Sequence, residues 1–234
     1  MTNSAHKAAA RFACLLMLWL LGPALTAPAG PAAHVVVIGV DGLGAAGVRN
    51  AEAPTLRQHW KDFGRLLETN APNVLRHVKD AIETAEAAIK NIRGMKPDFL
   101  FVHFDGVDHA GHAFGWNSRQ YLKAVELTDA LISGILDVIA ESGLKDNTVV
   151  LVTADHGGKG TQHGGASPGE LEIPWLLSGP GVAAGREIQS VVNTYDTAPT
   201  LALLLGVKPP ACWIGRPVSE AFAETGPKSK AAGP

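Results

Sequence analysis

The stretch HVVVIGVDG, residues 34–42, decides the fold. Its first seven residues, His34 to Val40, are nearly all apolar and rich in β-branched side chains. An uninterrupted run of this kind is typical of a strand that is buried on both faces, as the strands of a parallel sheet are. The run ends at Asp41-Gly42, a pair of residues that favours a turn, so we expect the strand to end there.

Predicted strands and helices alternate along the rest of the chain. Apolar residues recur at three- and four-residue steps in the helical segments, and Asn73 is the expected cap of the first. The alternation predicts right-handed crossovers and an α/β fold, a three-layer α/β/α sandwich with a mostly parallel sheet. The further elements expected are helices over 73–93, 118–142 and 197–205, and strands over 99–104, 148–153 and 173–177.

Acidic residues and histidines follow three of these strands. Asp41 follows the first, Asp108 and His112 come soon after the second, and Asp155 and His156 come directly after the third. The carboxyl ends of parallel strands meet at one edge of a sheet, where ligands bind. Oxygen and nitrogen donors held on rigid strand ends suit a divalent metal ion, and their number suits two ions.

Four motifs occur in a fixed order: VIGVDG at 37–42, DHAGH at 108–112, TADHGG at 153–158 and QHGG at 162–165. Together they resemble the alkaline phosphatase superfamily, and within it the type I phosphodiesterases and nucleotide pyrophosphatases. The resemblance implies an alkaline phosphatase-like fold and hydrolysis of phosphate esters with two divalent metal ions.

The resemblance also implies a ligand set. One metal ion is expected on Asp108, His112 and His163, and the other on Asp41, Asp155 and His156. Mixed imidazole and carboxylate ligands favour Zn²⁺, although Mn²⁺ and Fe stay open, whereas Mg²⁺ prefers oxygen ligands alone. Two ions roughly 4 Å apart can stabilise an in-line displacement at phosphorus.

Plainer interpretations of single residues stay open beside this one. Asp41 could merely stabilise the turn after its strand. His163 lies among glycines and could be a surface histidine. Asp105 is closer to the end of its strand than Asp108 is, but the motif points to Asp108, so Asp105 is left outside the metal set.

The sequence departs from the resembled family at the nucleophile, a Thr or Ser that the family places between its first metal-binding Asp and the Asp-x-x-Gly-His motif. Between Gly42 and Pro97 there is no serine, and the only threonines are Thr55, Thr69 and Thr84. Thr55 is a weak candidate: it follows Pro54 at a possible helix start, where amides attract an anion, but its turn matches a segment before the family's nucleophile. We therefore expect an internal deletion of the nucleophile segment, a truncated fold and an unpaired sheet edge.

The ends of the chain differ from its middle. Lys7 and Arg11 precede ten apolar residues, a pattern typical of a secretory signal peptide over 1–29 and too short for a stable membrane anchor. We expect a hydrolase domain over 30–222, a disordered tail over 223–234 and export to the periplasm or the exterior. The net charge of −2 offers no basic surface for nucleic acid.

The sequence therefore predicts a metal-dependent phosphohydrolase of the phosphodiesterase or nucleotide pyrophosphatase type, acting on a small-molecule phosphate ester. A water molecule could replace the missing hydroxyl as the attacking group. The alternative is a non-catalytic remnant of such an enzyme that binds metal or phosphate.

Overall fold

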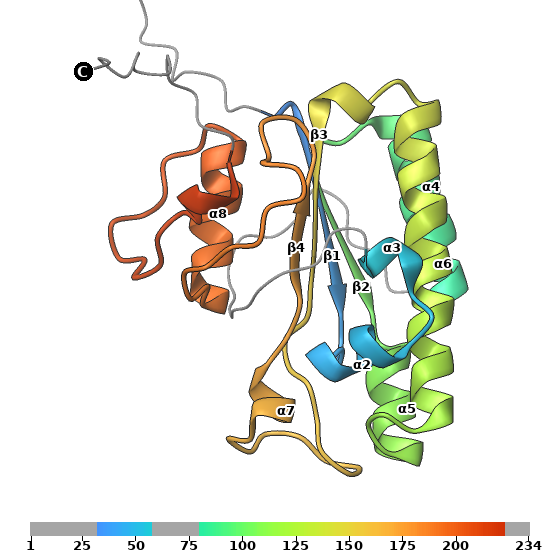
Figure 1. Cartoon of the computed structure of the whole chain (residues 1–234). Helices are drawn as coiled ribbons and strands as arrows, with labels where there is room; N and C mark the ends of the chain where they lie inside the picture. Colours follow the sequence, from blue (N-terminus) through green and yellow to red (C-terminus); the bar gives the residue numbers. More distant parts are fainter. Residues whose placement is uncertain (1–31, 58–79, 223–234) are drawn as a thin grey trace, which may run out of the picture.

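A four-stranded sheet forms the centre of the protein. A computed structural model describes residues 32–57 and 80–222. The strands are β1 (His34–Val40), β2 (Phe99–Phe104), β3 (Thr148–Thr153) and β4 (Trp175–Ser178), in the order β2-β1-β3-β4. β1 pairs in parallel with β2 and β3, while β4 runs antiparallel to β3 (Figure 1). The predicted mostly parallel sheet is confirmed.

Helices cover the sheet on both faces. On one face lie α2 (Ala45–Asn50), α3 (Pro54–Arg57), α4 (Ala81–Met95), α5 (Gly106–Phe114) and α6 (Arg119–Glu141), and on the other lies α8 (Thr197–Leu204) (Figure 1). The side chains of β1 alternate between two apolar clusters: Ile38 points into the cluster with α4 and α6, and Val37 into the cluster with α8. The sandwich therefore has the three expected layers.

The long helices begin at residues that cap them. Ser118 accepts a hydrogen bond from the Tyr121 amide (3.2 Å) at the start of α6, as the predicted start of that helix requires. The start of α4 differs from the prediction. Asp80, in an extended conformation, caps α4 by accepting from the amides of Ile82 and Glu83 (2.9 Å each), so α4 begins after Asp80 and not after Asn73. Residues 73–79 lie outside the described part of the chain.

Two further expectations need correction. The fourth strand occupies Trp175–Ser178 instead of 173–177, and α8 ends at Leu204. The segment after β2, for which the sequence predicted no helix, forms α5, in which Val107 and Gly111 are buried four residues apart. Such a short helix gives too little periodicity to be separated from a loop by sequence. The predicted signal peptide and the predicted tail lie outside the described residues.

The strand β2 forms one edge of the described sheet. Its side chains Phe99, Phe101 and His103 are exposed, while Val102 and Phe104, on the other face of the strand, are buried against α4 and α6. Within the described part of the sheet, β2 and β4 are the two edges, and an edge left unpaired by a deletion stays a prediction.

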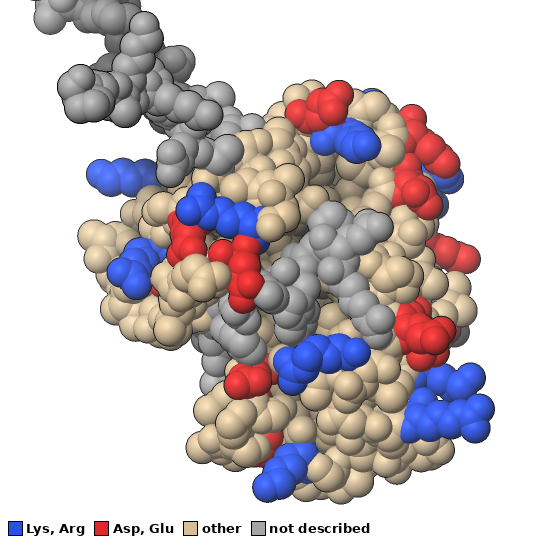
Figure 2. Space-filling model, in the orientation of Figure 1, with Lys and Arg blue, Asp and Glu red and all other residues tan. Residues whose placement is uncertain are grey.

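Charged side chains of both signs are scattered over the face shown in Figure 2, with no continuous basic area on it. Among the described residues, no helix is both long enough and apolar enough to cross a bilayer.

Asp129 on α6 links two elements in the helical layer. Its carboxylate is 3% exposed and accepts from the amides of Thr55 (3.1 Å) and Leu56 (2.6 Å), in the first turn of α3. Asp129→Ala should lower the free energy of unfolding by about 1–3 kcal/mol, because buried amides lose their acceptor. Urea unfolding measures the change. Asp137 is an exposed residue of the same helix, and Asp137→Ala should change the free energy of unfolding by less than about 0.5 kcal/mol. Equal losses in the two variants would contradict the capping role of Asp129.

Candidate metal centre

The register of the sheet assembles the candidate site. Val40 of β1 pairs with Phe104 of β2, and Gly39 pairs with Thr153 of β3. The residues that follow these strands therefore emerge side by side at the carboxyl edge of the parallel strands, at the lower end of the sheet in Figure 1.

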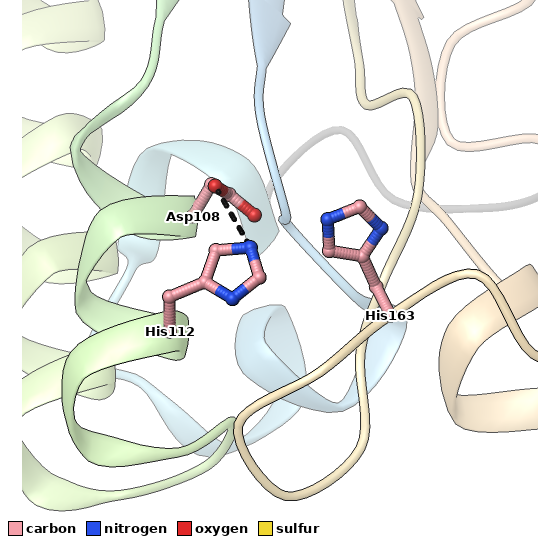
Figure 3. Close-up of side chains that lie close together, drawn as sticks. All are labelled: Asp108, His112 and His163. Atoms are coloured by element: carbon pink, nitrogen blue, oxygen red, sulfur yellow. Dashed lines mark ion pairs between the residues drawn. The ribbon is translucent and has the colours of Figure 1, made fainter.

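One cluster at this edge contains Asp108, His112 and His163. Asp108 and His112 lie one turn apart on α5, with Asp108 Oδ2 3.5 Å from His112 Nε2. His163 comes from the loop after β3, and its ring centroid lies 5.0 Å from that of His112 (Figure 3). One potential ligand atom from each residue lies within 4.8 Å of the other two. These are the residues for which the sequence predicted a shared metal ion.

A second cluster contains Asp41, Asp108 and His156, with ligand atoms again within 4.8 Å of one another. His156 Nε2 lies 3.4 Å from Asp41 Oδ1 and 4.0 Å from Asp108 Oδ1. Asp155 Oδ2 lies 3.6 Å from the same nitrogen, while Asp155 Oδ1 accepts from the amides of His156 (2.9 Å) and Gly42 (3.3 Å). Five of the six predicted ligands thus form two groups that share Asp108, whereas Asp155 lies beside His156 without belonging to either group.

The two clusters are joined through their histidines. The rings of His156 and His163 are stacked, with centroids 3.7 Å apart and planes 13° from parallel. His163, which sequence alone could equally have placed on a mobile surface, therefore lies against the second cluster as well as the first.

In His112 and His156, one ring nitrogen is hydrogen-bonded to the backbone and the other is left to bind a metal ion. His112 Nδ1 lies 3.0 Å from the carbonyl oxygen of Thr161, and His156 Nδ1 lies 2.8 Å from that of Gly157. A carbonyl oxygen only accepts, so each Nδ1 carries the proton and each neutral ring presents the Nε2 lone pair to the carboxylates. A lone pair facing a carboxylate is stabilised by a cation between them.

The buried oxygen of Asp108 supports the same conclusion. Asp108 Oδ1 is inaccessible to solvent and has no hydrogen-bond partner among the described residues. A buried carboxylate oxygen without a partner is costly, and a bound cation would remove that cost. The residues present therefore fit a pair of divalent metal ions.

The backbone below the clusters is packed too closely for side chains at two positions. Gly42 has φ +68°, and a Cβ there would lie 2.7 Å from the Cα of Asp108. Gly157, between the metal-site loops, would place a Cβ 3.0 Å from the Cα of Gly44. The turn after β1 therefore lies directly against α5 and against the loop after β3.

Two aromatic residues hold that turn from beneath. Trp116 Nε1 and the Tyr121 hydroxyl both donate to the carbonyl oxygen of Gly42, at 2.8 Å each. Burial raises the pKa of the Tyr121 hydroxyl, so it stays a donor at neutral pH. The position of Asp41, one residue earlier, is fixed by these contacts.

The loop that carries His163 is closed by Glu170 on the short helix α7 (Pro168–Leu171). The Glu170 carboxylate accepts from the amides of Gly165 (2.8 Å) and Ser167 (3.2 Å), and its backbone carbonyl accepts from the amide of Gly157 (2.8 Å). The Ser167 hydroxyl and these amides lower the pKa of the Glu170 carboxyl. The contacts of Glu170 therefore hold both ends of the loop.

His103 was not predicted as a member of the site. It lies on β2 next to the end of β1, with Nε2 3.4 Å from Asp41 Oδ2. The Asp41 carboxylate raises the pKa of His103 above 6.5. Burial raises the pKa of Asp41, but the contacts with His103, His156 and Asp155 together outweigh burial and lower the pKa below 3.8. His103 pairs with Gly39, two residues before Asp41, so its proximity to the site depends on the register between two strands.

Thr55, the weak candidate nucleophile, is bound elsewhere. Its amide donates to Asp129 of α6, and it lines a small apolar cavity with Ile132 and Val152. Among the described residues, no hydrogen bond or ion pair joins a serine or threonine side chain to the six predicted ligands. The structure thus gives Thr55 no contact with the metal centre.

The fold and the site together define an α/β protein with an aspartate and histidine centre at the carboxyl edge of its sheet. A family model described as "Type I phosphodiesterase / nucleotide pyrophosphatase" matches residues 55–167, which include five of the six predicted ligands. Residues 55–167 are thus similar to the type I phosphodiesterase and nucleotide pyrophosphatase family, as the sequence motifs predicted.

Individual relatives agree with this assignment. The chain is 30% identical over 163 residues to the catalytic subunit of human GPI ethanolamine phosphate transferase 3, a match that covers 68% of this chain and 14% of the relative. It is 31% identical over 148 residues to GPI ethanolamine phosphate transferase 2 of Schizosaccharomyces pombe, covering 55% of this chain and 19% of that protein. The chain thus spans less than a fifth of the length of these two relatives.

Among solved structures, the fold is similar to that of an alkaline phosphatase superfamily protein from Vibrio parahaemolyticus. The TM-score is 0.60 at 16% identity, and the match covers 84% of this chain and 72% of that one. The similarity to the alkaline phosphatase PafA has a TM-score of 0.54 at 14% identity, with 62% and 53% of the two chains covered. At these identities the likeness shows the fold.

Glu170→Ala should loosen the His163 loop, because the amides of Gly165 and Ser167 lose their acceptor. We expect hydrogen exchange of these two amides to accelerate by about 10-fold or more, as measured by NMR. Glu172→Ala removes a neighbouring, partly exposed carboxylate that accepts from neither amide and should leave both rates unchanged. Unchanged rates in Glu170→Ala would contradict the role given to Glu170.

In the metal-free chain, His103 should titrate above 6.5, as followed by NMR of its ring protons. Asp41→Asn should lower the pKa of His103, since the neighbouring charge is lost; Asp105→Asn should lower it less, because Asp105 contributes only a weaker Coulombic attraction. The raised pKa of His103 stabilises the folded state. This contribution is complete below pH 6.5 and is lost as the pH rises through the pKa that His103 has in the folded chain. An unchanged pKa in Asp41→Asn would contradict the pairing.

Proposed function

We propose that the chain is a metal-dependent phosphohydrolase of the phosphodiesterase or nucleotide pyrophosphatase type, which hydrolyses phosphate esters with two divalent metal ions. The observation that carries the proposal is the convergence of five aspartate and histidine side chains into two groups that share Asp108, with Asp155 beside His156. The Oδ1 atom of Asp108 is buried and has no hydrogen-bond partner among the described residues. Ethanolamine phosphate transferases among the relatives support chemistry at a phosphate ester.

Zinc is the metal ion that we propose. Each cluster combines carboxylate oxygens with at least one imidazole nitrogen, and this mixture suits Zn²⁺ better than Mg²⁺ or Ca²⁺. Asp108, His112 and His163 would hold one ion, and Asp41, Asp155 and His156 would hold the other. Asp108 is a member of both clusters, so its negative charge would act on both metal ions.

Metal ions at these positions would supply the positive charge that stabilises the attacking and leaving oxygens of an in-line displacement at phosphorus. The chain's own groups orient the ligands: Asp155 is fixed by the amides of His156 and Gly42, and the ring of His112 by the carbonyl of Thr161. The side chains of Asp155 (49% exposed) and His112 (38% exposed) leave the outer side of the site open to a substrate.

The attacking oxygen would come from water. Among the described residues, no serine or threonine side chain is hydrogen-bonded to the six ligands, and the Thr55 amide is held by Asp129. Hydrolysis would form a bond from the water oxygen to phosphorus, break the ester bond and return a proton to the leaving alcohol. A small phosphate ester is the proposed substrate.

A second candidate function follows from the lack of contact between Thr55 and the proposed metal ligands. If water does not replace the missing hydroxyl, the chain would bind divalent metal or phosphate without turnover. Export to the periplasm or the exterior is proposed separately, from the apolar run near the start of the sequence.

The purified chain, loaded with Zn²⁺, should hydrolyse bis(4-nitrophenyl) phosphate, and a chelator should abolish the release of nitrophenol until Zn²⁺ is restored. Asp155→Ala should reduce the rate on the order of 100-fold or more, because a proposed ligand is lost. Asp105→Ala, an exposed acidic residue outside the proposed ligand set, serves as the control and should retain the rate. Zinc binding without any turnover would contradict the hydrolase and support the second candidate.

A further inference from the structure

We propose that His103 is a positioning residue for the metal centre: it holds one carboxylate oxygen of Asp41 so that the other faces the metal position shared with His156. The inference rests on the proposed function and adds a residue outside the six predicted ligands.

The two oxygens of Asp41 face different partners. Oδ2 lies 3.4 Å from His103 Nε2, and Oδ1 lies 3.4 Å from His156 Nε2. A carboxylate that ligates a metal through one oxygen is commonly oriented by a donor to the other, and such donors contribute to metal affinity. His103 has the chemistry and the position of that donor, because its ring N–H can only be satisfied by an acceptor such as Oδ2.

The sheet in turn fixes the ring of His103. His103 pairs in register with Gly39 on β1, the strand that ends at Asp41. Its ring stacks with that of Phe101, with centroids 6.3 Å apart and planes 19° from parallel. A Cβ on Gly39 would lie 3.3 Å from the Phe101 ring and 3.4 Å from His103 Nδ1, so both rings lie directly over the glycine.

The position of His103 separates it from the ligands. Its side chain is 47% exposed, whereas that of Asp41 is 23% exposed and that of His156 is 17% exposed. Neither of the two ligand groups includes His103. It therefore lies on the outer side of Asp41, where it can orient the carboxylate without occupying the space between the clusters.

Calorimetric titration of Zn²⁺ alone into the metal-free chain tests the proposal in two backgrounds. The His163→Ala background removes a ligand of the cluster that contains His112 and keeps the cluster that contains Asp41 intact. The His156→Ala background removes a ligand of the cluster that contains Asp41 and keeps the cluster that contains His112 intact. In the first background His103→Ala should weaken zinc binding by about 10- to 100-fold, and in the second it should leave the affinity unchanged. His103→Gln, which keeps an N–H donor, should recover most of the loss.

The control is His109→Ala, which removes an exposed histidine of α5 and should alter neither background. Each metal-free His103 variant should keep the circular-dichroism spectrum of its parent, which shows that the variant is folded. Equal losses in both backgrounds, no loss in either, or a His103→Gln variant as weak as His103→Ala would overturn this inference alone. Absence of zinc binding by the unaltered chain would overturn the proposed function as well.

Discussion

The parallel pairing of β1 with both of its neighbours is the constraint on which the rest of the protein depends. The register brings the ends of β1, β2 and β3 to one edge, and the residues that follow them then lie within a few ångströms of one another. Predicted ligands as far apart in sequence as Asp41 and His163 meet only because this ladder is in place. Burial of β1 against an apolar cluster on each face stabilises it.

Sequence patterns were sufficient for those parts of the fold that depend on local chemistry. The bounds of β1, β2 and β3 match the predicted ones, because long apolar runs that end at Gly or Asp have few alternatives. β4 was placed two residues early and its antiparallel direction could not be predicted. The chain returns from β3 through a loop and the short α7, without a crossover helix, so β4 begins at the edge where β3 ended.

The sequence likewise predicted one part of the candidate site and could not predict another. Motif order was enough to name the six residues that converge, but the ligand groups were expected to share no residue, and Asp108 lies in both. The contacts of His103 with Asp41 and of Glu170 with the His163 loop depend on which elements pack together, and no local pattern contains that information. The fixed position of Thr55 likewise follows from Asp129, which is 74 residues away in sequence.

The close backbone packing beneath the ligands has an evolutionary consequence. Gly42 and Gly157 lie where neighbouring main chains touch, so almost any substitution there would push apart the segments that carry Asp41, Asp108 and Asp155. The open rim around His112 and Asp155 has no comparable restriction. In the evolution of this chain, the surface around His112 and Asp155 could therefore change, and with it the molecules that fit there. The closely packed backbone at Gly42 and Gly157 would stay the same.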